Sequence, residues 1–452
     1  MPETLQLVRN IGSTLVTRAV TLVLALLSSV LLARVLGPEG RGLFALVMIL
    51  PSLVGTVGLL GFEQANAVYA GLEPRRRRAL AWQSAAVAAG VGGALAAASA
   101  IYFIAGAPGL EALAAAPSTF VLLLLATIPA QLVVQYWSAI IRGMNRIRSI
   151  NLLEVGTRVA GLAGIVVLVW WLNLGVAGVV WLEVVMTLGG AVVVGVLLWT
   201  AGGWGAPVWD TGLWRRVAGF ALPVHMGTIA AYLNYRVDEV FIASLLPAKQ
   251  LGLYVIAAAL VERIWILPGS VSTVLLPHLT NSRERDASVV AVICRHVAMW
   301  TGAACVILLV VAGPLVTLLY SSEFAGAVAP LRWLLPGIFT LSIGKVLVGE
   351  LLAREKVRYT VWASGAAVVT NVVGNVLLVP QMGISGAALA SSISYSVLSG
   401  VLTWYYLRVT GTRWTSLVPR VEDLSAYRNL WYRVIRGHVT SGEPVVGRGA
   451  AK

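Results

Sequence analysis

The chain has 452 residues, of which 58% are hydrophobic and only 12% are charged. Soluble domains usually carry about 25% charged residues, so this surplus of apolar side chains excludes one soluble core and requires lipid as the outer solvent. A net charge of +14 would suit nucleic-acid binding. We exclude that interpretation because the basic residues lie beside hydrophobic stretches, the pattern that sets membrane topology.

Twelve stretches are apolar enough to cross a bilayer as helices, since one span needs about 20 mostly apolar residues. In chain order they are residues 11–35, 41–63, 79–106, 117–141, 150–171, 175–199, 217–246, 251–275, 289–312, 328–352, 359–379 and 384–407. The third and seventh stretches are long, which predicts that they are tilted or broken. We expect no cleavable signal peptide, because the first stretch is long and contains Arg18.

The basic residues between the spans support this count. With the N-terminus in the cytoplasm, the outer segments hold three, which are Arg34, Arg41 and Lys249. The cytoplasmic segments hold fourteen, which are Arg75, Arg76, Arg77, Arg78, Arg142, Arg146, Arg148, Arg215, Arg216, Arg283, Arg285, Arg354, Lys356 and Arg358. This bias predicts a multi-pass protein of the cell membrane with both termini in the cytoplasm.

The two halves of the chain resemble each other. A shift of 210 residues places Gly42-Leu43-Phe44 on Gly252-Leu253-Tyr254, and a shift of 208 places Gly175 to Gly178 on Gly383 to Gly386. Each half holds six spans, so the repeat predicts two six-helix lobes related by a pseudo-two-fold axis along the membrane normal. Transporters with such repeats place the substrate between the halves and rock one half against the other.

This organisation predicts four segments. They are an N-terminal lobe (1–200), a cytoplasmic linker (201–216), a C-terminal lobe (217–407) and a basic cytoplasmic tail (408–452). Within the tail, Leu424, Tyr427, Trp431 and Val434 recur at helical spacing with arginines between them. This pattern is typical of an amphipathic helix on the anionic inner leaflet, and a disordered tail is the alternative.

Three runs resemble a known family. The run from Leu31 to Phe44 is similar to the first outer hairpin of the polysaccharide biosynthesis (O-antigen, Wzx-type) flippases. Those proteins belong to the multidrug/oligosaccharidyl-lipid/polysaccharide exporter superfamily. The run from Arg236 to Ile242 resembles the seventh helix of that family, and the run from Gly383 to Leu389 resembles the entry to its last helix. The resemblance extends over nearly all of the predicted membrane part.

The resemblance implies a flippase that moves an oligosaccharide on a polyprenyl diphosphate from the inner to the outer leaflet. Assembly into O-antigen, capsule or exopolysaccharide would follow, with the polysaccharide polymerase machinery as a partner. The related lipid II flippases usually carry two further helices, which this chain lacks, so lipid II is the less favoured cargo. The fold implied is the two-lobe arrangement predicted above, with no cofactor.

Ionisable residues inside predicted spans are candidates for the site, because each costs at least about 2.5–3.5 kcal/mol to insert. An anionic diphosphate favours a cationic cavity, for which we predict Arg18, Arg236, Arg263 and Lys345. The alternative for each is a salt bridge or a side chain that reaches the interface; for Arg236 the partners would be Asp238 and Glu239.

Other charged residues suggest ion coupling or structure. Asp238, Glu262 and His225 are the candidates for binding a proton or Na⁺ whose gradient would drive transport. A helix–helix hydrogen bond is the alternative for His225. Glu154 and Arg158 stand four residues apart on one helix, which predicts a structural ion pair.

The sequence contains no phosphate-binding loop, no H-E-x-x-H and no C-x-x-C, so we expect neither an enzyme nor a metal site. The two cysteines, Cys294 and Cys305, are expected to be buried apolar residues.

A cation-coupled multidrug exporter of the same superfamily is the main alternative, and it would need an acidic cavity. A membrane glycosyltransferase or polymerase would need a large outer loop with clustered acids. The longest predicted outer loop, 107–116, has one acidic residue, Glu111. A non-transporting scaffold would not require so many buried charges.

Overall fold

The computed structural model describes residues 2–108, 114, 116–265, 268–269, 287–354, 356–420 and 422–423. Within these ranges the chain is helical and contains no β-strand. In lipid every backbone amide must find its partner inside the protein, and a helix satisfies this condition within a single segment. The prediction of an all-α polytopic membrane protein is therefore confirmed.

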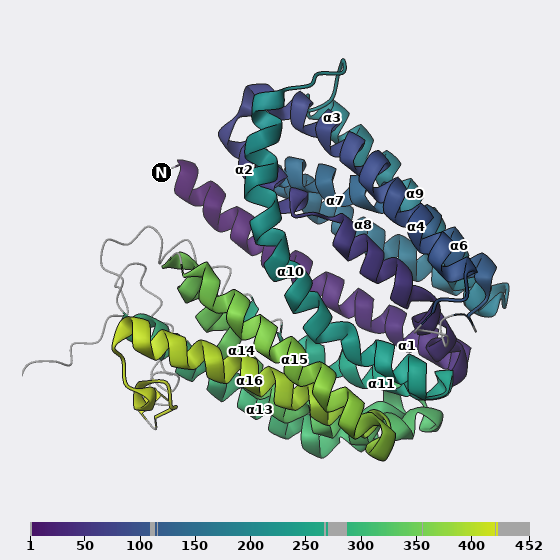
Figure 1. Ribbon diagram of the computed structural model, residues 1–452, viewed down its shortest axis with the longest axis vertical. Helices are drawn as coiled ribbons and strands as arrows, with labels where there is room; N and C mark the ends of the chain where they lie inside the picture. The colour runs from purple at the N-terminus through teal and green to yellow at the C-terminus, as the bar shows by residue number, and fades with distance from the viewer. Residues whose placement is uncertain are drawn as a thin grey trace, which may run out of the picture.

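The first half consists of antiparallel helices with several local breaks (Figure 1). Helix α1 (Pro2–Gly58) forms two legs that meet at Gly37, where the backbone leaves the helical region (φ 66°, ψ 179°) just before Pro38. Positive φ angles at Leu60 and Gly61 then separate α1 from α2. The following elements are α2 (Phe62–Leu72), η1 (Pro74–Arg76), α3 (Arg77–Val87), the π-helical η2 (Ala88–Gly92), α4 (Gly93–Ile104), α6 (Ser118–Ala126), α7 (Ile128–Gly143), α8 (Ile147–Gly164), the π-helical η3 (Ile165–Trp171) and α9 (Gly175–Thr200).

The second half begins with a long helix that carries several polar residues, α10 (Thr211–Leu245). The elements after it are α11 (Ala248–Glu262), η4 (Arg263–Trp265), α13 (Ala287–Tyr320), η5 (Ser322–Ala327), α14 (Val328–Ala353), α15 (Val357–Met382), α16 (Ile384–Thr410) and η6 (Trp414–Ser416). Glycine starts α16 because Gly383 has a positive φ of 59°.

Nine helical stretches of the described chain are long and apolar enough to span a membrane. This is fewer than the twelve predicted spans for three local reasons. The two legs of α1 count as one stretch. The polar side chains of α10, among them His225, Asn234 and Arg236, lower its hydropathy. The α-helix α11 has only 15 residues. The third predicted span is interrupted by the π-helical turn at Ala88–Gly92, in line with its expected break.

The helices of each half pack mainly with one another, which gives two bundles (Figure 1). In the first half α2 packs on α7, and α1 on α8. In the second half α14 and α15 pack on α16. The bundles meet where α1 contacts α11. We call the end with the Gly37 kink and the α10–α11 turn the hairpin end, and the opposite end, which carries Arg75–Arg78, the basic end. The predicted segment limits at residues 200, 216 and 407 stay predictions.

Helix α10 belongs to both bundles. Its first part packs on α2, where the rings of Tyr69 and Phe220 lie 6.3 Å apart. There, His225 Nε2 donates a hydrogen bond to Val57 O at 3.0 Å. Its last part packs on α15 and α16. In Figure 1 α10 accordingly runs from beside α2 at the top to α11 below.

The segment before α10 is fixed to the first bundle. The ring of Trp204 lies between those of Trp82 and Trp137, with both centroids at 4.5 Å. Trp82 Nε1 also donates to Gly205 O at 2.9 Å. At the start of α10 the Asp210 carboxylate accepts a hydrogen bond from Leu213 N at 2.9 Å. This bond lowers the pKa of Asp210 below its ordinary value, and a nearby arginine adds to the effect.

The start of the predicted tail contacts α13, because Arg295 pairs with Asp423 at 2.8 Å. Arg295 Nη1 also donates to Ser416 O at 3.0 Å. The predicted amphipathic helix around Leu424 to Val434 lies outside the described residues.

Replacing Trp204 tests the attachment of this segment. We expect Trp204→Ala to lower the free energy of unfolding by about 2–4 kcal/mol, because it leaves a cavity between two rings. Trp171→Ala is the control, since Trp171 is 78% exposed and packs little against the protein. Thermal unfolding of the purified protein in detergent measures both, and equal shifts for the two variants would contradict the stacking role.

Candidate functional site

The larger pocket lies between α1, α10 and α11 and has a volume of about 670 Å³. We call it the central pocket. Much of its wall is apolar and includes Phe44, Met48 and Leu53 of α1 and Leu233 and Val240 of α10. A polar ligand in such a pocket loses much of its water, and every charge that it meets acts more strongly there than in bulk solvent.

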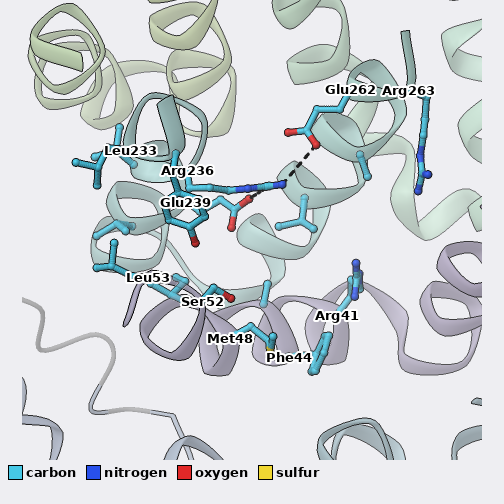
Figure 2. A pocket seen from close by; sticks show the side chains of 17 residues that line it. Arg41, Phe44, Met48, Ser52, Leu53, Leu233, Arg236, Glu239, Glu262 and Arg263 are labelled. Atoms are coloured by element: carbon cyan, nitrogen blue, oxygen red, sulfur yellow. Dashed lines mark hydrogen bonds and ion pairs between the residues drawn. The ribbon is translucent and has the colours of Figure 1, made fainter. Parts of the chain in front are cut away.

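Five charged side chains reach into the central pocket from three helical segments (Figure 2). Arg236 of α10 pairs with Glu239 at 2.6 Å and with Glu262 of α11 at 3.4 Å. These two carboxylates are thereby engaged by one guanidinium group. Arg41 and Arg263 supply two further positive charges, so the arginines of the pocket outnumber its acids by one.

The two other arginines of the central pocket are not neutralised in this way. No described residue accepts a hydrogen bond from the buried Arg41 Nε, and its guanidinium lies 5.7 Å from the centroid of the Phe44 ring. Arg263 is half-buried and takes part in none of the ion pairs among the described residues. A desolvated cation without a counter-charge is expensive to maintain, and a site of this kind favours an anionic ligand.

A second pocket of about 400 Å³ adjoins the first through Arg263, which lines both. We call it the arginine pocket, because Arg18 of α1 and Arg158 of α8 also line it. Thr21, Leu22, Ala25 and Gly269 complete its described lining. The two pockets together carry five arginines and two glutamates, so the combined surface is cationic.

A family model described as polysaccharide biosynthesis protein matches residues 7–283. The chain belongs to this family. A second model, described as lipid II flippase MurJ, matches residues 158–420. A search of curated protein sequences found no match. Membership places the chain among the flippases and transporters of the exporter superfamily, as the sequence resemblance implied.

Solved structures of the same superfamily share the fold of this family member. The lipid II flippase MurJ in an inward closed conformation has a TM-score of 0.68 at 15% identity, over 96% of this chain and 94% of that one. An inward-facing multidrug resistance MATE family transporter has a TM-score of 0.67 at 13% identity, over 86% and 95%. A transporter of the superfamily from Pyrococcus furiosus, described as having a binding pocket of reverse polarity, has a TM-score of 0.63 at 13% identity, over 89% and 95%.

Three of the four predicted cavity cations line the pockets. Arg236 and Arg263 line the central pocket, and Arg18 and Arg263 the arginine pocket. Lys345 lies elsewhere, with its Nζ 4.6 Å from the centroid of the Trp265 ring and 5.2 Å from that of Tyr235. It is not among the described residues that line either pocket.

The three predicted ion-coupling residues lie in different surroundings. Glu262 lines the central pocket. His225 is buried at the contact of α10 with the first bundle, where it donates to Val57 O. Asp238 is 2% exposed and lies inside the second bundle, where its Oδ2 accepts hydrogen bonds from Tyr254 and, at 2.9 Å, from Ser391.

The predicted ion pair between Glu154 and Arg158 does not form. Both side chains are exposed, and neither occurs in any ion pair among the described residues. Helical spacing of four places two side chains on one face, but it does not hold two exposed and flexible side chains together. Arg158 lines the arginine pocket instead.

Sequence reasoning missed Arg41, which it counted as an outer-loop residue. The second leg of α1 begins at Pro38, directly after the kink at Gly37. Arg41 therefore lies in the first turn of this leg and lines the central pocket. The run Gly37-Pro38 was the available signal, because proline is favoured in the first turn of a helix. Sequence reasoning also missed Asn234 and Ser394, which are joined by a 2.5 Å hydrogen bond beside Asp238.

The two kinds of arginine in the central pocket predict opposite effects on stability. We expect Arg41→Gln to leave the free energy of unfolding unchanged or raised, because it removes a desolvated charge without a counter-ion. Arg236→Gln leaves Glu239 and Glu262 without their shared partner, so we expect a loss of about 1–3 kcal/mol. Thermal unfolding in detergent measures both, with the exposed Arg332→Gln as control. A large loss of stability in Arg41→Gln would mean that this side chain is structural.

Proposed function

We propose that this family member moves a polyprenyl-diphosphate-linked oligosaccharide from the inner to the outer leaflet by alternating access. The observation that carries the proposal is a pair of arginines, Arg41 and Arg263, that face adjoining pockets and take part in none of the ion pairs among the described residues. A diphosphate is an anionic partner for both, because guanidinium groups bind its oxygens in pairs.

The two pockets suit the two polar parts of such a lipid. The diphosphate lies at their junction, where Arg263 is shared and Arg18, Arg41 and Arg158 approach from the first bundle. The oligosaccharide enters the central pocket, whose volume of about 670 Å³ is in the usual range of ligand sites. There, Glu239 and Glu262 accept hydrogen bonds from sugar hydroxyl groups, and the apolar wall packs on the sugar faces. The polyprenyl chain stays in the lipid.

The pocket charges favour this cargo over a cationic drug. A cation exporter needs a pocket with an excess of negative charge, whereas Arg236 offsets the charge of Glu239 and Glu262 and the arginines of the central pocket outnumber its acids. Lipid II is a second candidate cargo, and the match of residues 158–420 to the MurJ model favours it. It carries the same diphosphate on a different headgroup, so the arginines would act alike on both.

The orientation follows from the charge distribution. The basic end, with Arg75–Arg78, faces the cytoplasm, and the protein resides in the cytoplasmic membrane with both termini inside. The polysaccharide polymerase machinery then takes the cargo on the opposite side.

Flipping in proteoliposomes tests the function. A fluorescent oligosaccharide on a polyprenyl diphosphate is placed in one leaflet, and its protection from a membrane-impermeant quencher reports arrival in the other. Parallel samples carry lipid II and a fluorescent organic cation. We expect protein-dependent protection of the diphosphate lipids. Gradient-driven efflux of the cation with no movement of either lipid would favour the drug-exporter alternative.

Removing two arginines tests the site. We expect Arg18→Ala combined with Arg263→Ala to reduce the flipping rate at least tenfold, because each charge-assisted hydrogen bond contributes about 1.5–3 kcal/mol. Arg332→Ala is the matched control, since Arg332 is exposed and outside both pockets. Unimpaired flipping in the double variant would show that the site assignment is wrong.

Asp238 is the ion-coupling residue that the surroundings favour. A buried carboxylate held by two hydroxyl groups binds a proton or Na⁺ more strongly in one conformation than in another and so transmits a gradient. We expect Asp238→Asn to remove the effect of imposed proton or Na⁺ gradients on the flipping rate. Slow flipping that does not depend on a gradient should persist. Flipping is measured with each gradient in turn; an unchanged gradient response in this variant contradicts the assignment.

A further inference from the structure

Two glycines, one from each bundle, meet at the hairpin end. An ideal Cβ added to Gly42 of α1 would overlap the carbonyl oxygen of Ala248 and would lie 3.0 Å from the backbone nitrogen of Gly252. An ideal Cβ added to Gly252 of α11 would overlap the carbonyl oxygen of Pro38 and would lie 2.8 Å from the nitrogen of Gly42. The two backbones therefore touch directly, without side chains between them.

This contact is reciprocal in a way that reflects the internal repeat. Pro38 and Gly42 of the first half correspond to Ala248 and Gly252 of the second half at the same offset of 210 residues. Each glycine meets the carbonyl four residues before the other one. Such a self-complementary arrangement is typical of a two-fold axis, which places the pseudo-two-fold axis at this contact. Among the described glycines, no other pair meets reciprocally in this way.

The central pocket begins at this contact and extends toward the basic end. Its α1 lining runs from Arg41 to Leu53, and its α11 lining runs from Val255 to Arg263. The backbones at Gly42 and Gly252 are thus the next ones beyond the lining of the pocket at the hairpin end. Close by, Arg34 Nε donates to Leu319 O at 2.7 Å, and the hydroxyl groups of Ser29 and Tyr320 lie 3.4 Å apart.

We propose that the contact of Gly42 with Gly252 is the outer gate of the transporter, which closes the central pocket in this conformation and parts when the cargo leaves. No hydrogen bond of the described residues links the two glycines, so parting the gate breaks only short-range backbone contacts and leaves no buried amide unpaired. The inference rests on the proposed function in assuming that the two bundles move relative to each other and that the hairpin end faces outward.

Sided cysteine labelling tests the gate without any cargo. In a chain with Cys294 and Cys305 replaced by alanine, Ser52→Cys places one thiol in the central pocket. A membrane-impermeant maleimide is applied to intact cells and to inverted vesicles. We expect the thiol to react from the side of the basic end only. Gly42→Ala and Gly252→Ala each force the backbones apart, and we expect them to raise labelling from the opposite side at least about fivefold.

Matched controls separate gating from a general effect of alanine in a helix. An added Cβ at Gly189 or Gly400 would meet nothing within 4 Å, so we expect Gly189→Ala and Gly400→Ala to leave the sidedness unchanged. If Gly42→Ala lowers thermal stability and labelling stays one-sided, the contact is static packing and the proposal is wrong. Labelling needs no cargo, so a failure of the flippase proposal does not affect this outcome.

A second measurement covers the case in which the alanine variants fail to fold. Ser29→Cys with Tyr320→Cys places two thiols across the same end, and a cleavable bifunctional thiol reagent joins them. We expect joining to stop cargo movement in proteoliposomes and reductive cleavage to restore it to the level of the unjoined variant. Persistent movement at complete cross-linking would overturn the proposal. If the parent protein moves no test lipid at all, labelling replaces the transport measurement. The reactivity of the Ser52→Cys thiol toward the maleimide is then measured from each side of the membrane, before and after residues 29 and 320 are cross-linked. Unchanged reactivity from both sides counts against the gate.

Discussion

The central constraint in this protein is the free energy of a guanidinium group held away from water without a counter-ion. Arg41 is the nearest example, because no described residue accepts a hydrogen bond from its buried Nε and it occurs in none of the ion pairs among the described residues. Much of the wall of the central pocket is apolar, so such a charge is costly there and the pocket favours an anionic ligand. The paired Arg236 shows the contrast: its two glutamates compensate it within the protein and make it part of the structure. In our proposal the unpaired charges therefore bind the ligand, and the paired ones maintain the structure.

Much of the fold could be predicted because lipid imposes a simple rule on sequence. A span is a long apolar stretch, and basic loops set its direction; the observed helices accordingly follow the predicted stretches, such as α9 at Gly175–Thr200 against 175–199. The rule does not specify how helices break. The kink at Gly37, the interruption at Leu60 and Gly61 and the π-helical turn at Ala88–Gly92 depend on local backbone geometry and on neighbours that a single sequence does not reveal.

The site was less predictable for a related reason. An intramembrane charge can be found in the sequence, but its partner depends on which helices meet in space. Arg18 and Arg263 are separated by 245 positions in the chain and still line one pocket. Lys345 also lies inside a predicted span, yet it is placed over the rings of Tyr235 and Trp265. Arg41 was missed because it stood at the very edge of the predicted span 41–63 and was counted with the outer loop, whereas the second leg of α1 begins just after Gly37. For an ion pair such as Glu154–Arg158, helical spacing supplies proximity of backbones only.

The internal repeat connects the site to the proposed gate. Gly42 follows Arg41 directly in α1, so the backbone that touches Gly252 is continuous with the side chain that lacks a counter-ion. An anion that draws Arg41 toward Arg263 acts on that same turn of helix. Because the two close approaches are reciprocal, they are lost together when the bundles part. The sequence similarity of Gly42-Leu43-Phe44 to Gly252-Leu253-Tyr254 then has a physical reason: each half supplies the small residue that allows the other half to approach.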